Sequence, residues 1–342
     1  MKQSLEFLYL SQEDVIAAGG LEMTETLRTV ERSFCLVGNG QGVEPLSPTV
    51  KWEGGEGQRI GANFGGLAGD LNIAGVRWIT LNPTNPAKRN QPGTIQLITI
   101  SDPQTGFPLA IMDSTLILER RVGAISGVAA KYLARRDSEV AGLIGLGIIT
   151  RVQITALKEV LKKIKRVKVF DVDTRRAETF AREMGAVLSL PMEVMGSAKE
   201  TVEGSDVVAV ATSGVGLADS YVEPSWIKVG SLCSTLSSYD AKVETIARSD
   251  KIVLDNIQAL DCTDRNLGLF CAQGLLKREK ILDLAAIVAG RTPGRESEKE
   301  KIFFMSWGMV LCDVAEAHRI YQRAKEKGIG RVLELWHRPY WM

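Results

Sequence analysis

The sequence has little histidine, no regular cysteine pattern and no excess of either charge. Its 342 residues include two histidines, and its five cysteines stand at wide, irregular spacings. Chemistry that depends on a histidine base or on several histidine metal ligands is therefore not expected. The cysteines predict neither a disulfide framework nor a zinc site, and we interpret them as packed thiols. No bound metal is predicted.

The charges nearly cancel, at a formal net charge of +1. A protein that binds nucleic acid or a membrane surface would carry a basic excess, so neither partner is expected. No stretch offers the roughly 18 uncharged apolar residues of a membrane-spanning helix. Residues 1–10 also lack the basic and apolar regions of a secretory signal. These absences predict a cytoplasmic protein.

The chain does have length and apolar content, since 45% of its residues are hydrophobic. A chain of this size can bury a large core and favours two domains over one. Residues 1–120 contain a helical pattern over 24–37 and then short strand-like runs separated by Gly- and Pro-rich turns. The segment 82–93 is too rich in Pro and Asn to form an element. This part predicts a mostly antiparallel sheet domain.

Strands and helices alternate from residue 139 onward. Strand-like runs lie at 140–144, 167–171, 186–190, 207–211, 231–235 and 252–254. A helical pattern at 116–133 precedes them, and a helix at 310–327 and a strand at 331–336 follow. The alternation predicts an α/β fold with a Rossmann doubly wound parallel sheet, which binds its ligand at the carboxyl ends of the strands.

A glycine turn follows the first of these strands. The run 140–144 leads into Gly145-Leu146-Gly147 and a helical pattern. Such glycines let the backbone approach a pyrophosphate, whose charge faces the N–H groups of Ile148 and Ile149 at the helix start. The third glycine position holds Thr150, and Gly-x-Gly alone is more typical of a simple strand-to-helix turn.

A carboxylate downstream strengthens the dinucleotide interpretation. Asp171 ends the second strand, roughly 20 to 30 residues on, where a ribose-binding acid is expected. Its charge would repel a 2′-phosphate, so we predict NAD as the cofactor. Arg175 and Arg176 follow closely and could instead accept that phosphate, or they occupy the exposed first turn of a helix.

Several further motifs are shared with one protein family. They are Gly75-Val76-Arg77-Trp78, Asp102-Pro103-x-Thr105-Gly106-x-Pro108, Met112-Asp113, Arg121, Gly145-x-Gly147, and Gly308 with Asp313. Over nearly its whole length the chain resembles the ornithine cyclodeaminase and mu-crystallin family. The resemblance implies a homodimer. Residues 1–120 with 309–342 would form an α+β substrate-binding and dimerisation domain, and residues 121–308 the NAD-binding domain.

The resemblance also implies which residues meet the substrate. Family members hold the substrate α-carboxylate with basic side chains, and the matching positions are Lys51, Arg77 and Arg121. Lys51 and Arg77 exchange the usual Arg and Lys, which keeps the charge and alters the geometry. Asp240 stands in the loop where cyclodeaminases place a catalytic Asp, and the alternative is a helix N-cap. Lys51 and Tyr239 are the further candidates for proton transfer.

Other family positions concern the cofactor. Thr212, Ser213 and Leu236 follow strands whose ends line the nicotinamide ribose in family members. Gly308 is expected to allow close approach of the backbone to the cofactor. Asp313, one turn into the last helix, is expected to be structural.

The loop Asn85-Pro86-x-Lys88-Arg89-Asn90 bears on the substrate. It resembles family members of 2,3-diaminopropionate biosynthesis, which implies NAD-dependent oxidation of N-(2-amino-2-carboxyethyl)-L-glutamate to 2-oxoglutarate and L-2,3-diaminopropionate. Three carboxylates on one substrate favour extra cations, so Arg89 and Asn90 are expected to bind it. A solvated loop is the alternative.

Two rival functions stay open. One is another reaction of the family. It would be either the cyclisation of ornithine or the reaction of a ketimine reductase or amino-acid dehydrogenase. The other is a protein that holds NAD(P)H and a small ligand without turning anything over.

Overall fold

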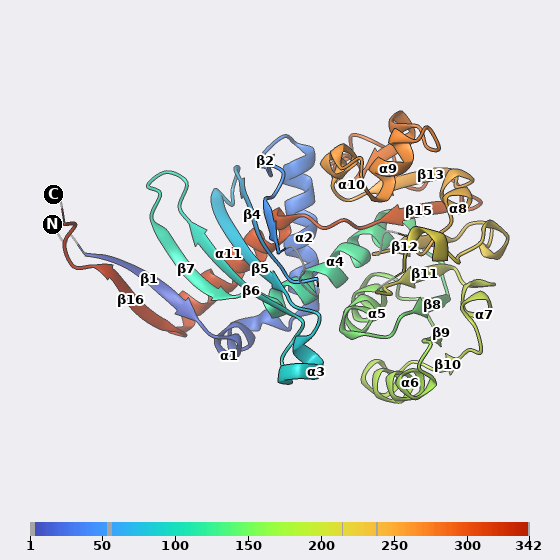
Figure 1. The fold of residues 1–342 in the computed structure, drawn as a ribbon, viewed down its shortest axis with the longest axis horizontal. Helices are drawn as coiled ribbons and strands as arrows, with labels where there is room; N and C mark the ends of the chain where they lie inside the picture. The colour runs from blue at the N-terminus through green and yellow to red at the C-terminus, as the bar shows by residue number, and fades with distance from the viewer. Residues whose placement is uncertain (1–3, 53–56, 214, 237–238, 341–342) are drawn as a thin grey trace. The chain divides into compact units, whose positions relative to one another are not determined.

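The computed structural model describes residues 4–52, 57–213, 215–236 and 239–340. The chain divides into two compact units, each with its own sheet (Figure 1). Unit 1 comprises Met1–Arg121 and Met309–Met342, and unit 2 comprises Val122–Gly308. The boundary falls inside helix α4 (Thr115–Leu133). Of the helices described, none is both long and apolar enough to cross a membrane.

Unit 1 contains an eight-stranded mixed sheet. Its strands are β1 (Leu5–Leu10), β2 (Gly42–Val43), β3 (Thr49–Lys51), β4 (Arg59–Leu67), β5 (Ile73–Leu81), β6 (Thr94–Ser101), β7 (Pro108–Asp113) and β16 (Arg331–Trp336). The order is β16-β1-β7-β6-β5-β4-β2, with β3 paired to β4. Only β1 and β7 pair in parallel among these neighbours.

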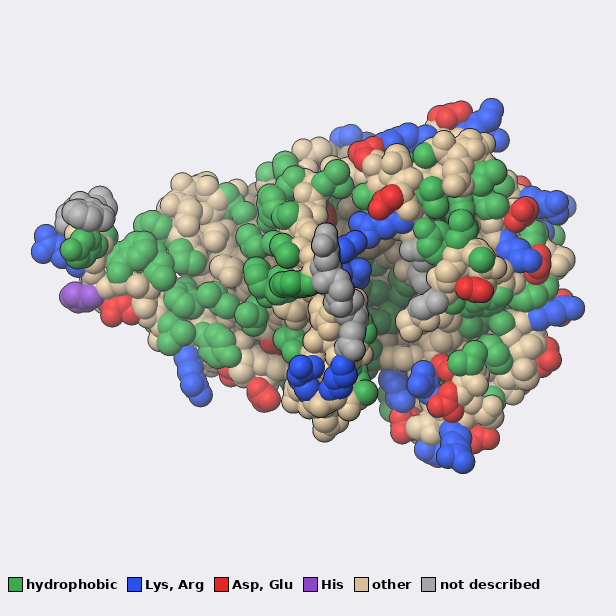
Figure 2. Space-filling model, viewed as in Figure 1, with side chains coloured by type: hydrophobic (Ala, Val, Ile, Leu, Met, Phe, Trp, Pro, Cys, Tyr) green, Lys and Arg blue, Asp and Glu red, His purple; other side chains and the backbone are tan. Residues whose placement is uncertain are grey.

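Helices cover one face of this sheet and leave the other apolar and open. Helices α2 (Met23–Gly38) and α11 (Val310–Lys327) pack together, and α11 lies against β4 and β5. Because alternate strand residues point to opposite faces, the uncovered face presents a set of side chains that are 39% to 47% exposed: Phe64, Val76, Trp78, Ile95 and Leu97. We call this set the apolar sheet face. Figure 2 shows hydrophobic side chains gathered over the strands of this unit.

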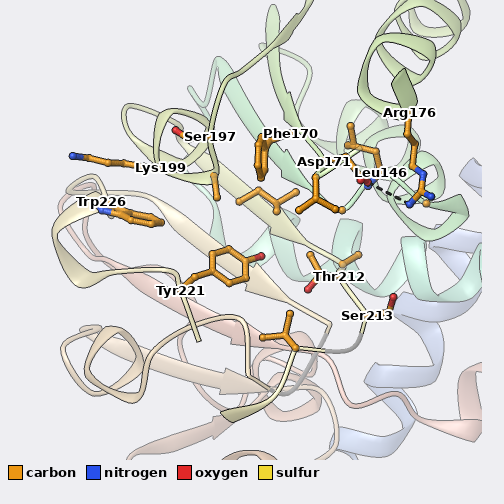
Figure 3. A pocket seen from close by; sticks show the side chains of 17 residues that line it. Leu146, Phe170, Asp171, Arg176, Ser197, Lys199, Thr212, Ser213, Tyr221 and Trp226 are labelled. Carbon is orange, nitrogen blue, oxygen red and sulfur yellow. Dashed lines mark hydrogen bonds and ion pairs between the residues drawn. The ribbon is translucent and has the colours of Figure 1, made fainter. Parts of the chain in front are cut away.

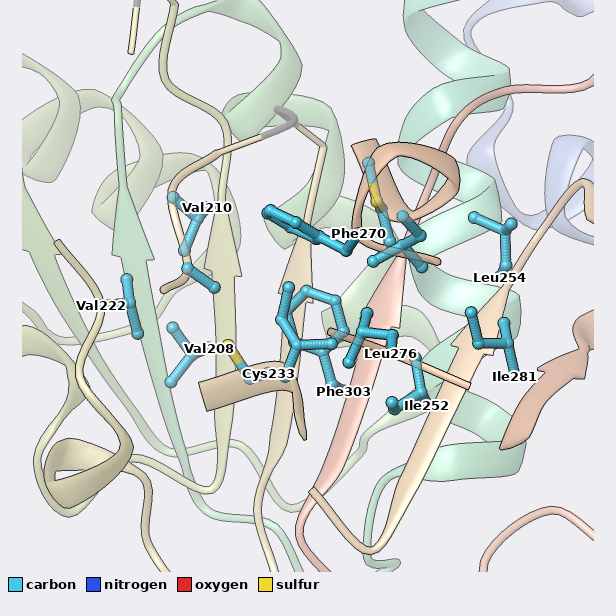
Figure 4. Packing of buried hydrophobic residues seen from close by; sticks show 14 of the residues in the cluster. Val208, Val210, Val222, Cys233, Ile252, Leu254, Phe270, Leu276, Ile281 and Phe303 are labelled. Atoms are coloured by element: carbon cyan, nitrogen blue, oxygen red, sulfur yellow. The ribbon is translucent and has the colours of Figure 1, made fainter. Parts of the chain in front are cut away.

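Unit 2 contains an eight-stranded sheet in which every pair is parallel. Its strands are β8 (Val140–Ile144), β9 (Arg166–Phe170), β10 (Met192–Val194), β11 (Val207–Val210), β12 (Leu232–Thr235), β13 (Lys251–Leu254), β14 (Ile281–Asp283) and β15 (Ile302–Met305). The order is β10-β9-β8-β11-β12-β15-β13-β14. Figure 4 shows part of the core, where Val208, Cys233, Phe270 and Phe303 pack together. The strand order reverses beside β8, which is where doubly wound sheets bind ligands.

The α/β fold prediction is confirmed, and the last helix and last strand have the predicted bounds. Two local predictions were wrong. The segment 186–190 is no strand, because helix α6 (Thr174–Leu188) continues with buried Ala177, Phe180 and Met184 along one side, and β10 begins at Met192. A short apolar run does not distinguish a strand from a buried helix end.

The second error concerns the segment 82–93, which contains the short helix α3 (Asn85–Arg89). Pro86 stands in its first turn, where the missing N–H costs nothing. Asn90 ends it with a φ of 51°, in the left-handed region that Asn tolerates. The Pro and Asn that argued against an element are therefore its start and its end.

Candidate functional site

The glycine turn of unit 2 joins β8 to helix α5 (Ile148–Val160). Gly145 has a φ of +79°, and a Cβ there would lie 2.7 Å from the carbonyl oxygen of Ala211. Packing within the protein therefore demands glycine. At Gly147 a Cβ would meet no described atom within 4 Å. The missing side chain of Gly147 thus leaves space in front of the helix and fills no packing need of the protein.

The start of α5 is suited to an anion. Its N-cap, Gly147, offers no side-chain cap. The N–H groups of Ile148 and Ile149 therefore have no capping side chain, at the positive end of the helix dipole. Thr150 faces the other way: it is completely buried, and its hydroxyl donates to the carbonyl oxygen of Gly145. Thr150, which replaces the third glycine, thus stabilises the turn from its buried side and leaves the space in front of the helix free.

A cavity of about 590 Å³ opens at this turn (Figure 3). It is lined by Ile144, Gly145, Leu146, Gly147, Phe170, Asp171, Val172, Arg176, Ser197, Ala198, Lys199, Ala211, Thr212, Ser213, Val215, Tyr221 and Trp226. The lining comes mainly from the carboxyl ends of β8, β9 and β11 and the segments after them. This volume lies within the range of small-molecule and cofactor pockets.

Asp171 is tied to the glycine turn. Its Oδ2 accepts a hydrogen bond from the N–H of Leu146 at 2.8 Å, and its Oδ1 accepts from the N–H of Asp173 at 3.0 Å. Of the two arginines that could favour NADP, Arg176 lines the cavity and places Nη1 3.7 Å from Asp171 Oδ2. Arg175 does not line it. A carboxylate and one cation thus lie close together in the cavity lining.

The remaining predicted cofactor residues fall into two groups. Thr212 and Ser213 line the cavity, whereas Leu236 is half-buried after β12 and is not part of the lining. Gly308 donates its N–H to Asp255 Oδ2 at 2.9 Å. Asp255 was not among the predicted residues. Its signal was available, because Asp255 follows a buried strand just as Asp171 does.

Asp240 lies behind the cavity wall. It is completely buried and does not line the cavity, and the hydroxyl of Thr212 donates to its carboxylate. Burial raises the pKa of this carboxyl, while the hydroxyl bond opposes the rise. The helix N-cap interpretation was wrong, since Lys242 caps helix α8 (Val243–Ala247). The hydroxyl of Thr212, which lines the cavity, thus lies between the cavity and the Asp240 carboxylate.

Unit 1 brings two predicted substrate residues together. Arg77 Nη1 donates to Asp313 Oδ2 at 2.7 Å, and Arg121 Nε donates to Asp313 Oδ1 at 3.0 Å. Arg77 Nη2 also donates to Asn63 Oδ1 at 3.0 Å. Both arginines are buried, and burial lowers the pKa of Arg77 while the charge of Asp313 opposes that shift. We call Arg77, Arg121 and Asp313 the arginine cluster.

Glu44 adjoins this cluster and was not predicted. Its Oε1 accepts the N–H of Val310 at 3.0 Å, at the start of α11. Its Oε2 is buried and has no hydrogen-bond partner among the described residues. Burial raises the pKa of Glu44 to about 7, and the charge of Asp313 adds to the rise. Nothing in the sequence around Glu44 signals this position.

The other predicted substrate residues lie on exposed elements. Lys51 is exposed on β3, in register with Arg59 of β4. Arg89 is exposed on α3 and donates to Asn85 Oδ1 at 3.2 Å, and Asn90 is the C-cap of that helix. Across the described ranges, no group of three or more His, Cys, Asp or Glu forms a metal site.

The family model of the ornithine cyclodeaminase/mu-crystallin family matches residues 11–328, and the chain belongs to that family. The predicted resemblance is confirmed. Two characterised relatives align with nearly the whole chain. N-((2S)-2-amino-2-carboxyethyl)-L-glutamate dehydrogenase of Staphylococcus aureus is 29% identical over 337 residues, covering 97% of this chain and 99% of the relative. Alanine dehydrogenase of Archaeoglobus fulgidus is 30% identical over 342 residues, with 97% and 99% covered.

Solved structures give the same result. Thermococcus litoralis Δ1-pyrroline-2-carboxylate reductase, in complex with NADH and L-proline, is 33% identical with a TM-score of 0.86, covering 95% of this chain and 99% of that one. An archaeal alanine dehydrogenase dimer with bound NAD is 30% identical with a TM-score of 0.87, with 97% and 100% covered. The predictions of an enzyme and of NAD agree with these relatives.

Proposed function

We propose that the protein is an NAD-dependent oxidoreductase that acts on the carbon–nitrogen bond of a small amino or imino acid. The observation that carries the proposal is the space at Gly147, which the protein's own packing does not require. When bound, the nicotinamide supplies hydride transfer. The first turn of α5 would hold the pyrophosphate and Asp171 the ribose hydroxyls.

The arginine cluster is our candidate for the substrate carboxylate. Guanidinium groups bind carboxylates through paired, charge-assisted hydrogen bonds, and each such bond contributes about 1.5 to 3 kcal/mol. For proton transfer we keep Lys51 and Asp240. Lys51 has an exposed ammonium, whereas Asp240 would act through the hydroxyl of Thr212.

For the particular substrate we propose N-(2-amino-2-carboxyethyl)-L-glutamate. Its secondary amine would be oxidised to an imine, and water would hydrolyse the imine to 2-oxoglutarate and L-2,3-diaminopropionate. The Staphylococcus aureus relative and the exposed Arg89 support this choice. The test is incubation of the protein with this substrate and NAD, with NADH absorbance as the readout. No NADH from this protein, beside an active relative assayed in parallel, would contradict it.

The second candidate is reduction of Δ1-pyrroline-2-carboxylate to L-proline, which the Thermococcus litoralis relative favours. NADH consumption with this imino acid, in the absence of activity on the glutamate adduct, would select it. Proline formation from ornithine without net NADH would select cyclodeamination instead. NADH binding without turnover of any of these compounds would indicate a binding protein.

We further propose a homodimer formed through the apolar sheet face, in the cytoplasm. A relative solved as a dimer and the exposed aromatic and aliphatic side chains support the dimer. All five cysteines are free, which suits a reducing compartment. Trp78→Glu should give monomers in sedimentation velocity, because it places a charge in the apolar sheet face. Val187→Glu, on an exposed position of α6, should leave the dimer intact.

A further inference from the structure

Asp313 is a buried carboxylate shared by two cations. It lies in the first turn of α11 and is completely buried. Its two oxygens divide between the arginines, one accepting from Arg77 Nη1 at 2.7 Å and the other from Arg121 Nε at 3.0 Å. Asp313 of α11 thus fixes the positions of two guanidinium groups, that of Arg77 on β5 and that of Arg121 on α4.

Two guanidinium groups held this close repel each other, and burial removes the water that would screen them. Burial lowers the pKa of Arg77, and the charge of Arg121 lowers it further, while Asp313 counteracts both effects. A charged pair in such surroundings persists only with a counter-anion. Asp313 is that counter-anion within the cluster.

We propose that Asp313 is a positioning residue of the substrate site, which holds Arg77 and Arg121 side by side and charged before the substrate carboxylate arrives. The inference rests on the proposed function, in which the two arginines bind that carboxylate. Below about pH 7, where Glu44 is protonated, two guanidiniums and one carboxylate leave one net positive charge, which matches one substrate carboxylate. A site ordered in advance loses less free energy on binding.

The chain offers a matched control on the same helix. Glu316 is also completely buried on α11. Its Oε1 accepts from Arg319 Nη2 at 2.7 Å and from the hydroxyl of Thr26 at 2.8 Å. The Thr26 bond joins α11 to α2, whereas the Arg319 bond lies within α11, so these partners of Glu316 differ from the partners of Asp313. Losing either carboxylate therefore removes a buried ion pair, but Asp313 pairs with Arg77 and Arg121 whereas Glu316 pairs with Arg319.

The first experiment compares Asp313→Asn with Glu316→Gln, using the substrate that the wild-type protein turns over best. We expect Asp313→Asn to raise KM about tenfold or more while kcat changes less than about threefold. The affinity for NADH, measured by calorimetry, should not change. Glu316→Gln should lower the melting temperature and leave KM within about twofold of the wild-type value.

The second experiment uses chemical rescue. Asp313→Ala removes the carboxylate and leaves space for formate, which should lower the KM of this variant severalfold. In the wild-type protein and in Glu316→Ala, formate should give no gain. A folded Asp313→Asn with wild-type KM, or equal rescue of Glu316→Ala, would overturn the positioning role. A wild-type protein that turns over none of the candidate substrates contradicts the proposed function instead, so the two failures are distinct.

Discussion

The two units build their polar sites in opposite ways. In unit 2 the candidate cofactor site is an open cavity beside a turn whose key feature is a missing side chain, at Gly147. In unit 1 the candidate carboxylate site is a closed cluster, in which Arg77 and Arg121 are buried against Asp313. The first depends on space and backbone N–H groups, whereas the second depends on charge balance.

This difference predicts different responses to mutation. A site made from backbone and space should lose ligand affinity with little loss of stability, since few contacts within the protein depend on it. A site made from buried charges should lose both, because removing one charge leaves its partner without compensation.

The largest expected effect is on the buried charges. Arg121→Met should lower the free energy of unfolding by about 3 to 5 kcal/mol, because Asp313 then keeps only one of its two cations. Arg176→Met removes a half-exposed cation from the cavity of unit 2. It should change the free energy of unfolding by less than about 1 kcal/mol. Urea unfolding measures both. Equal losses would remove the contrast between the units.

The next effect concerns the glycine turn. Gly147→Ala should fold normally and bind NADH about 100-fold more weakly, or ~2.7 kcal/mol, because its Cβ enters the space in front of α5. Gly145→Ala should lose affinity and stability together, since φ is +79° and the Cβ meets Ala211. Calorimetry and thermal unfolding separate the two outcomes. Wild-type NADH affinity in Gly147→Ala would show that no phosphate lies there.

A smaller change should follow at the ribose position. Asp171→Asn should weaken NADH binding about tenfold, and it should improve NADPH relative to NADH, because Arg176 then loses its anionic neighbour. The ratio of the two dissociation constants is the measurement. Asp173→Asn is the control, because Asp173 caps α6 and does not line the cavity. An unchanged ratio in Asp171→Asn would contradict the role of Asp171.

The last effect is a pH dependence in unit 1. Burial raises the pKa of Glu44 from 4.5 to about 7. Between these values the folded protein holds the proton and the unfolded chain does not. The stability from Glu44 is therefore present below about pH 4.5 and lost as pH rises to about 7. Relative to the wild type, Glu44→Gln should gain up to about 3 kcal/mol across this window. Urea unfolding between pH 5 and 8 is the measurement. A difference in free energy of unfolding between Glu44→Gln and the wild type that stays constant over this range would contradict the prediction.

Local patterns allowed much of unit 2 to be predicted. The run 140–144 is a strand with those bounds, and Gly145, Gly147 and Asp171 meet at one cavity. Each of these features depends on residues close in sequence or on the rule that parallel strands end at one edge. The end of α6 was mistaken for a strand because a short apolar segment carries no periodicity of its own.

Charge in the sequence was a weaker guide in unit 1. Lys51 and Arg89 were grouped with Arg77 and Arg121, but the structure leaves the first two on exposed elements and buries the other two. The sequence alone does not distinguish a basic residue that will be buried from one that will be exposed. Glu44 and Asp313 were missed as partners because they meet Arg77 or Arg121 from distant parts of the chain.

By itself, the sequence determined the alternation of elements, the glycine turn, the acid after β9 and the family, because these depend on periodicity, backbone freedom and short motifs. Only the tertiary structure decided that Asp313 joins two arginines, that Glu44 lies beside them and that Asp240 stands behind Thr212. Burial and the pairing of charges arise when distant segments pack. No local pattern records which carboxylate a buried guanidinium will meet.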